Sequence, residues 1–163
     1  GIPIDWYGYI WAALALTVAV SARYAGALEQ RLGTRNVLCL IGVLPLLGLI
    51  GMALGAGWIG VMFGFALQLS RGLSMSLFYE ALNRRVPGNF RATVNSLVSL
   101  AVRAIFIGTG PLLGYALDSM GVNSTLLLLA AIFTPVIAVV LVPLVVRIRR
   151  EETNKSLQVV PAN

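Results

Sequence analysis

The feature that most constrains this chain is a series of five long apolar runs, each separated from the next by a short polar segment. As a helix, each run of about 17–24 residues rises ~1.5 Å per residue and crosses the ~30 Å hydrocarbon core of a bilayer. We therefore predict an all-α integral membrane protein with five transmembrane helices. The predicted spans cover residues 9–25, 37–54, 58–78, 94–117 and 125–146.

Basic residues lie at every second boundary between these runs. Three Arg fall within 23–35 and three within 80–91, and further bases follow residue 146, whereas 55–57 and 118–124 carry none. Loops rich in Lys and Arg stay in the cytoplasm. We therefore predict a multi-pass protein of a bacterial inner (plasma) membrane, with its first residue outside and its carboxy-terminus in the cytoplasm.

Composition narrows the class of protein. Hydrophobic residues make up 58% of the chain and charged residues 11%, too few charges to cover a soluble surface. The net charge of +6 does not indicate nucleic-acid binding, because the bases are divided among three membrane edges, where they meet anionic lipid headgroups. The chain has no His and a lone Cys39, so we expect no metal site and no cofactor. The polar segment 151–163 is predicted to be a disordered cytoplasmic tail.

The first basic loop resembles a known signature. Residues 26–35 read GALEQRLGTR, which is similar to the G-x-x-x-D-R-x-G-R-R loop of the major facilitator superfamily, between that family's eighth and ninth helices. Gly26, Arg31 and Gly33 match, whereas Gln30 and Thr34 replace the family's Asp and Arg. Glycines allow a tight turn, and the bases can hold a helix end or an acidic partner.

Two later segments carry the same resemblance. Residues 87–96 are similar to the P-x-x-x-R-A-T-x-x-S run that enters the family's eleventh helix, and Gly110, Pro111, Gly114 and Asp118 resemble the end of that helix. The resemblance covers about residues 1–150 and implies helices eight to twelve, most of one six-helix bundle. The seven preceding helices are then a missing partner, in cis or in trans. We accordingly expect a fragment, or a gene product without its front, rather than a processed intact protein.

Arg71 is the charged residue that lies deepest in a span. It stands 13 residues from both Trp58 and Arg84, or ~20 Å of helix from each. A charge at this depth is costly unless it is satisfied. Gln68 and Ser74 share its helix stripe. Two interpretations stay open: Arg71 attracts an anionic group in a water-filled pathway, or it bonds carbonyls and polar neighbours inside the bundle.

A second polar stripe lies in the fourth span, where Arg103 follows Asn95 and Ser99 at successive helical turns. The candidate substrate pathway therefore comprises Gln68, Arg71, Ser74, Asn95, Ser99 and Arg103. Glu80 and Arg84 are spaced i, i+4 at the inner edge, as an interfacial pair or as a gate contact. The candidate cytoplasmic gating loop comprises Gly26, Arg31, Gly33, Arg35, Glu80, Arg84 and Arg91.

The function that these features favour is transport of a small solute by alternating access, as an efflux or uptake permease of the major facilitator type. The alternative is a non-transporting structural or interaction protein, a half-transporter that needs a partner. An intramembrane enzyme is disfavoured, because the sequence offers neither His nor paired acids in its spans. The expected partners are the lipid bilayer, a small-molecule substrate and the missing amino-terminal bundle.

Overall fold

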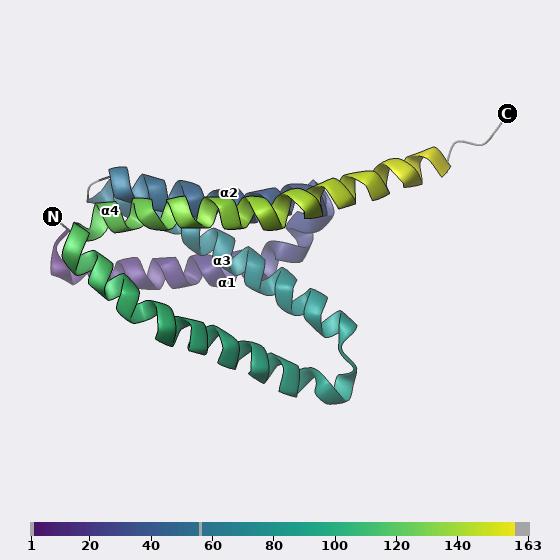
Figure 1. The fold of residues 1–163 in the computed structure, drawn as a ribbon, viewed down its shortest axis with the longest axis horizontal. Coiled ribbons are helices and arrows are strands. Elements are labelled where there is room, and N and C mark those ends of the chain that lie inside the picture. The colour runs from purple at the N-terminus through teal and green to yellow at the C-terminus, as the bar shows by residue number, and fades with distance from the viewer. Residues whose placement is uncertain (1, 56, 159–163) are drawn as a thin grey trace.

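The computed structural model describes residues 2–55 and 57–158, and the described residues form helices and turns without a strand (Figure 1). A short 3-10 helix, η1 (Ile4–Trp6), leads into α1 (Tyr7–Leu32). The helices α2 (Thr34–Leu54) and α3 (Trp58–Arg85) follow, and η2 (Gly88–Phe90) precedes α4 (Arg91–Gln158). All four α-helices are long and apolar enough to cross a membrane. The prediction of an all-helical membrane protein is confirmed in this form.

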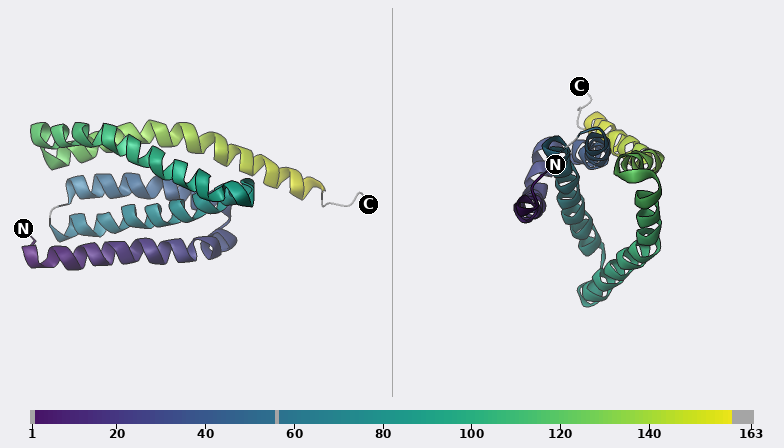
Figure 2. Two further views of the ribbon diagram at one scale, coloured as in Figure 1. Left: turned by 90° about the horizontal axis from the view of Figure 1, so that it is seen from below. Right: turned by 90° about the vertical axis from the view of Figure 1, so that its left-hand side faces the viewer.

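The long helix α4 is broken at Gly121. This glycine has φ 77° and ψ 170°, a combination that is essentially restricted to glycine. The break divides α4 into a first arm, residues 91–120, and a second arm, residues 122–158, which meet at the break and diverge away from it (Figures 1 and 2). Each arm is long enough to cross a bilayer, and the break at Gly121 lies between the fourth and fifth predicted spans.

The helices extend beyond the apolar runs at most of their ends. The first helix begins at Tyr7 and continues to Leu32, and α3 continues through its basic end to Arg85. The second arm continues as helix to Gln158, into the segment that the sequence analysis assigns to a tail. The remaining tail residues, 159–163, lie outside the described residues. Polar residues continue these helices because the backbone bonds of a helix do not require an apolar sequence.

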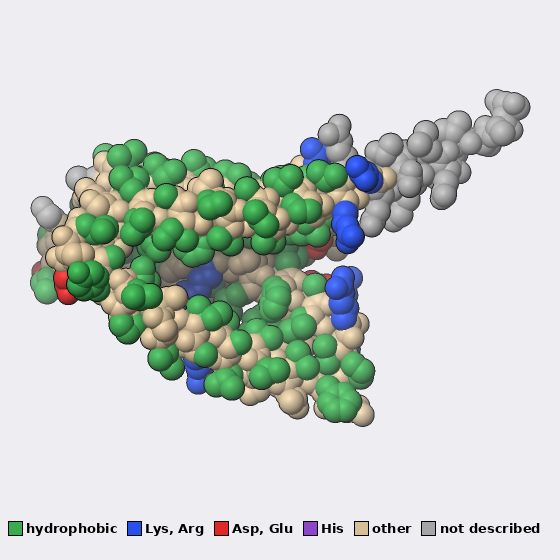
Figure 3. All heavy atoms as spheres, in the orientation of Figure 1, with side chains coloured by type: hydrophobic (Ala, Val, Ile, Leu, Met, Phe, Trp, Pro, Cys, Tyr) green, Lys and Arg blue, Asp and Glu red, His purple; other side chains and the backbone are tan. Residues whose placement is uncertain are grey.

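The connections alternate between two ends of the molecule. The turn at Gly33, the segment 86–90 and the end of the second arm lie at one end, and the turns near residues 55–57 and at Gly121 lie at the other (Figures 1 and 2). Figure 3 shows most of the visible Lys and Arg side chains toward the first of these ends. We call it the basic end, defined by Arg31, Arg35, Arg84, Arg85 and Arg147.

Small residues let the helices approach closely. A Cβ added to Gly72 of α3 would lie 1.8 Å from the hydroxyl oxygen of Ser21 and 2.6 Å from the carbonyl oxygen of Val18, both in α1. A Cβ at Gly51 of α2 would lie 2.1 Å from the ring of Phe63 in α3. Such close contacts supply the dispersion energy that holds helices together in lipid, where burial of apolar surface drives little association.

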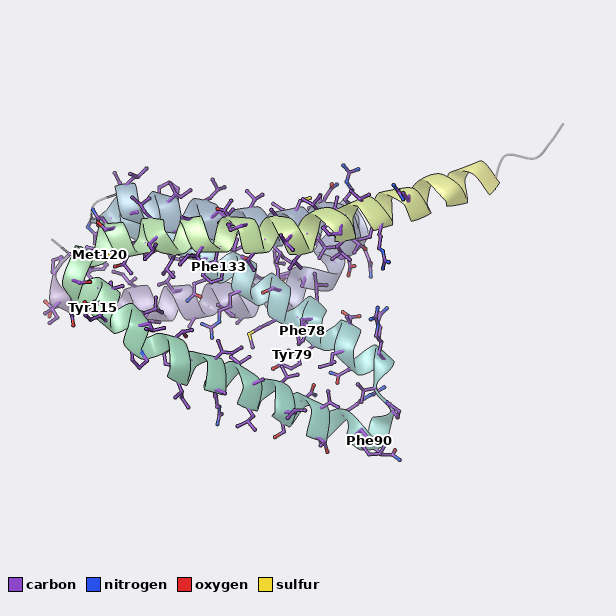
Figure 4. All side chains as sticks on the ribbon, in the orientation of Figure 1. Phe78, Tyr79, Phe90, Tyr115, Met120 and Phe133 are labelled. Atoms are coloured by element: carbon purple, nitrogen blue, oxygen red, sulfur yellow. The ribbon has the colours of Figure 1, made fainter. Side chains whose placement is uncertain are left out.

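The second arm completes this packing against α2. A Cβ at Gly42 would meet the side chain of Leu141 at 2.1 Å and that of Ile137 at 3.0 Å. We call α1, α2, α3 and the second arm the packed bundle. The first arm stands apart from it over most of its length (Figures 1 and 2). Figure 4 marks Phe90 just before its start and Tyr115 and Met120 toward its other end.

A proline in α2 is compensated by α3. Pro45 has no N–H, so it cannot bond the carbonyl of Ile41 one turn earlier. The hydroxyl of Ser70 in α3 donates a hydrogen bond to this carbonyl oxygen at 2.8 Å. The neighbouring helix thus satisfies the group that the proline releases, as membrane proteins require in a medium without water.

Candidate functional site

The first predicted stripe lies on the middle of α3. Arg71 is exposed, whereas Gln68 and Ser74 are half-buried. The hydroxyl of Ser74 donates to the carbonyl oxygen of Arg71 at 3.1 Å, so this serine bonds its own helix. The guanidinium of Arg71 makes no hydrogen bond or ion pair with another side chain that the structure describes. The interpretation of Arg71 as a base satisfied within the bundle therefore gains no support.

The second predicted stripe lies on the first arm. Asn95, Ser99 and Arg103 line a shallow depression of about 350 Å³ together with Ser96 and Leu100, and all of these residues belong to one helix. Ser99 and Arg103 are exposed. The stripe is therefore a face of the first arm rather than an enclosed site.

The two stripes are not joined by a hydrogen bond or an ion pair among the described residues. Their elements meet near the basic end, where the side-chain amide of Asn95 donates to the side-chain oxygen of Asn83 in α3 at 3.3 Å. The oxygen of Asn95 is buried there without a partner. Between the first arm and the packed bundle the surface is hollowed, and a basic side chain is visible inside the hollow (Figure 3).

A cavity of about 560 Å³ opens at the basic end, between α1, α2, α3 and the second arm. It brings together one predicted pathway residue, Ser74, and two predicted gating residues, Glu80 and Arg84. Arg84 donates to the carboxylate of Glu80 one helical turn away, as the i, i+4 spacing predicts. The remaining residues of its lining are Glu29, Thr34, Leu38, Ile41, Leu77, Phe78, Ala81, Arg85 and Leu144.

The other predicted gating residues do not line the cavity. Gly33 is the single residue between α1 and α2, and its φ of 81° explains why glycine stands there. Arg31 and Arg35 beside it are exposed, and a Cβ at Gly26 would meet nothing within 4 Å. Arg91 donates from Nε to the carbonyl oxygen of Val86 at 3.2 Å and so closes the turn before the first arm. The predicted gating residues therefore form two groups: Glu80 and Arg84 line the cavity, and the others do not.

Sequence reasoning missed several polar residues of this end. The carboxylate of Glu29 accepts a hydrogen bond from the hydroxyl of Thr34 at 2.8 Å across the Gly33 turn. Arg85, next to Arg84, lines the same cavity. Asn83 was missed as the partner of Asn95, although it lies two residues before the end of α3 and the next helix begins only a few residues later.

Comparisons with protein-family models, with characterised proteins and with solved structures give no match to this chain.

Proposed function

We propose that this chain forms one wall of a solute pathway in a secondary transporter of the major facilitator type. The observation that carries the proposal is Arg71, an exposed guanidinium at the middle of a membrane-length helix. An ionisable residue at this depth is costly, and in membrane proteins such residues face a water-filled cavity or a functional partner. The resemblance of three loop and helix motifs to that family supports the same function.

In the proposed arrangement, the first arm and the packed bundle enclose a hollow, and this hollow faces the pathway. A second helical bundle, from the same polypeptide or another, forms the opposite wall, and rocking between the two exposes the pathway to each side in turn. Arg71 and Arg103 attract an anionic group of the solute. Transport of this kind needs no covalent chemistry and no cofactor.

Accessibility to water tests the position of Arg71 without knowledge of the substrate. In a Cys39→Ser background, Arg71→Cys should react with a membrane-impermeant thiol reagent in proteoliposomes that contain the facing bundle. Val43→Cys is the matched control, because Val43 lies at the middle of α2 and its exposed side chain faces away from the helices that α2 contacts. Equal protection of both cysteines would refute a pathway at Arg71.

Activity is the second test. Arg71→Ala should abolish solute flux per folded molecule, and Arg71→Lys should weaken it, since an ammonium cannot reproduce the planar fork of a guanidinium. Arg23→Ala is the control, an exposed base near the basic end of α1. Unchanged flux per folded molecule in Arg71→Ala would remove Arg71 from the pathway.

The proposed orientation puts the basic end in the cytoplasm of a bacterial cell, by the positive-inside rule. Cysteines introduced at Ser119 and Ser156 test it in the same Cys39→Ser background. A reagent added outside intact cells should label Ser119→Cys and spare Ser156→Cys. The reverse pattern would invert the topology.

A non-transporting role in a membrane complex is the second candidate. The exposed first arm favours it, because a helix that contacts its own chain over little of its length offers a surface to another protein. Reconstitution separates the two candidates. A complex that contains both bundles and shows no flux for any solute of an anionic and neutral panel would favour the structural role.

A further inference from the structure

The cavity at the basic end has a polarity gradient along the membrane normal. Its deep walls are apolar and come from Ile41 and Leu77, whereas its mouth carries Glu29 and Arg85. From the level of Ser74 to that of Arg85, α3 rises ~16 Å. The cavity is therefore a slot with a charged mouth at the membrane surface and apolar walls that reach toward the bilayer centre.

The mouth carries two charges of opposite sign that the described side chains leave unneutralised. Glu80 is paired with Arg84. Glu29 accepts a hydrogen bond only from the neutral hydroxyl of Thr34, through one of its two oxygens, and forms no ion pair with a described side chain. Arg85, on the other side of the mouth, forms no ion pair with a described side chain. A carboxylate on α1 and a guanidinium on α3 thus face one opening.

We propose that this slot binds a zwitterionic amphiphile, namely a phospholipid of the leaflet at the basic end whose headgroup carries a primary ammonium and a phosphate. The ammonium donates to the free oxygen of Glu29, and the phosphate accepts from Arg85. One acyl chain lies along the apolar walls. The proposal requires only that the basic end lies at a membrane surface. It is therefore independent of the proposed transport function.

The charges and the shape exclude simpler ligands. An anionic lipid without an ammonium would satisfy Arg85 but would leave Glu29 charged beside its own phosphate. A soluble phosphate ester would leave the apolar walls of Leu38, Ile41 and Leu77 uncovered. Only a molecule with both charges and an apolar tail complements the whole lining.

Native mass spectrometry of the purified full chain in detergent tests the proposal. The probes are phosphatidylethanolamine, phosphatidylglycerol and the chain-free glycerophosphoethanolamine. We expect phosphatidylethanolamine to bind preferentially, and Glu29→Gln to weaken its binding about tenfold, the loss of one charge-assisted hydrogen bond, while phosphatidylglycerol binding is maintained. Arg85→Gln should weaken the binding of both lipids.

Three controls make the result decisive. Asp118→Asn and Arg23→Gln remove an acid and a base that do not line the slot, and both should bind like the unmodified chain. Ala81→Phe fills the slot without altering its charge and should weaken both lipids, with circular dichroism confirming the fold. Equal lipid binding by Glu29→Gln, Arg85→Gln and the unmodified chain would overturn the proposal. Binding of glycerophosphoethanolamine as strong as that of the lipid would also overturn it, because the apolar walls would then contribute nothing.

Discussion

The two arms of α4 are both rich in apolar residues but have opposite surroundings. In the second arm Thr125 is only 2% exposed and Ala130 5%, because this arm lies on α2. The first arm has no buried residue, and Ile107 is 73% exposed. Both arms are apolar enough to enter a membrane. Hydrophobicity is therefore compatible with both arms entering a bilayer, but it does not explain why only one of them packs.

The difference lies in what each helix faces. Gly42 opens a space on α2 that Leu141 and Ile137 of the second arm fill. On the first arm, a Cβ at Gly114 would meet nothing within 4 Å, and one at Gly110 only Phe106 of the same helix. Close packing in lipid needs a small residue and a side chain opposite it. Lipid or a facing bundle must cover the first arm instead.

The largest expected effect is a steric clash inside the packed bundle. Gly72→Leu would place a side chain against the Ser21 hydroxyl and the Val18 carbonyl of α1 and should destabilise the fold by about 3 kcal/mol or more. Gly114→Leu on the first arm is the matched control and should change stability by less than about 0.5 kcal/mol. Thermal unfolding in detergent measures both. Equal losses would show that the first arm is packed as tightly as α3.

The joint between the two arms should come next. Gly121→Ala forces an alanine into a conformation that costs of order 1–3 kcal/mol, so the joint should relax to ordinary helical or extended angles. Distances between spin labels on Leu100 and Val140 should then change. An unaltered distance distribution would mean that the position of the first arm does not depend on this glycine.

A smaller effect is expected at the proline of α2. Ser70→Ala leaves the carbonyl of Ile41 without a donor and should cost about 1 kcal/mol. Pro45→Ala restores an N–H within α2, so Ser70→Ala should cost clearly less in that background. The double-mutant cycle, read by unfolding in detergent, isolates the coupling. Additive losses would mean that the proline does not create the need for Ser70.

The smallest effect is expected where the first arm touches α3. Asn83→Ala removes the acceptor of the Asn95 amide, and since this hydrogen bond is long, stability should fall by about 0.5 kcal/mol. Hydrogen exchange of the first arm near the basic end should nevertheless increase. Exchange that is unchanged along the whole arm would show that other contacts hold it.

Sequence patterns predicted the membrane helices well, because a run of apolar residues is a local property. They did not predict which helices pack against one another. Gly110 and Gly114 lie one helical turn apart, but spacing does not say whether another helix lies opposite. The bond from Ser70 to Ile41 joins residues 29 apart, yet Pro45 marks the released carbonyl in the sequence and could have indicated a donor nearby.

The sequence indicated individual candidate residues, but it did not indicate which of them the fold brings together. Arg71 and Arg103 are both exposed, as a pathway requires, but they lie on separate elements that meet only near Asn83 and Asn95. The pair of Glu80 and Arg84 formed as predicted because its spacing lies within one helix. Glu29 and Arg85 were missed as a pair because α1 and α3 bring them to one cavity from distant parts of the chain.

The first arm is joined to the packed bundle at both of its ends, by residues 86–90 and by Gly121. A helix that is attached at both ends can rotate about its long axis, but it cannot move outward unless one of the two connections changes its conformation. Successive residues of a helix point about 100° apart. A roll of that size would therefore turn the face that carries Asn95, Ser99 and Arg103 away from its present direction and bring another face of the same helix into its place.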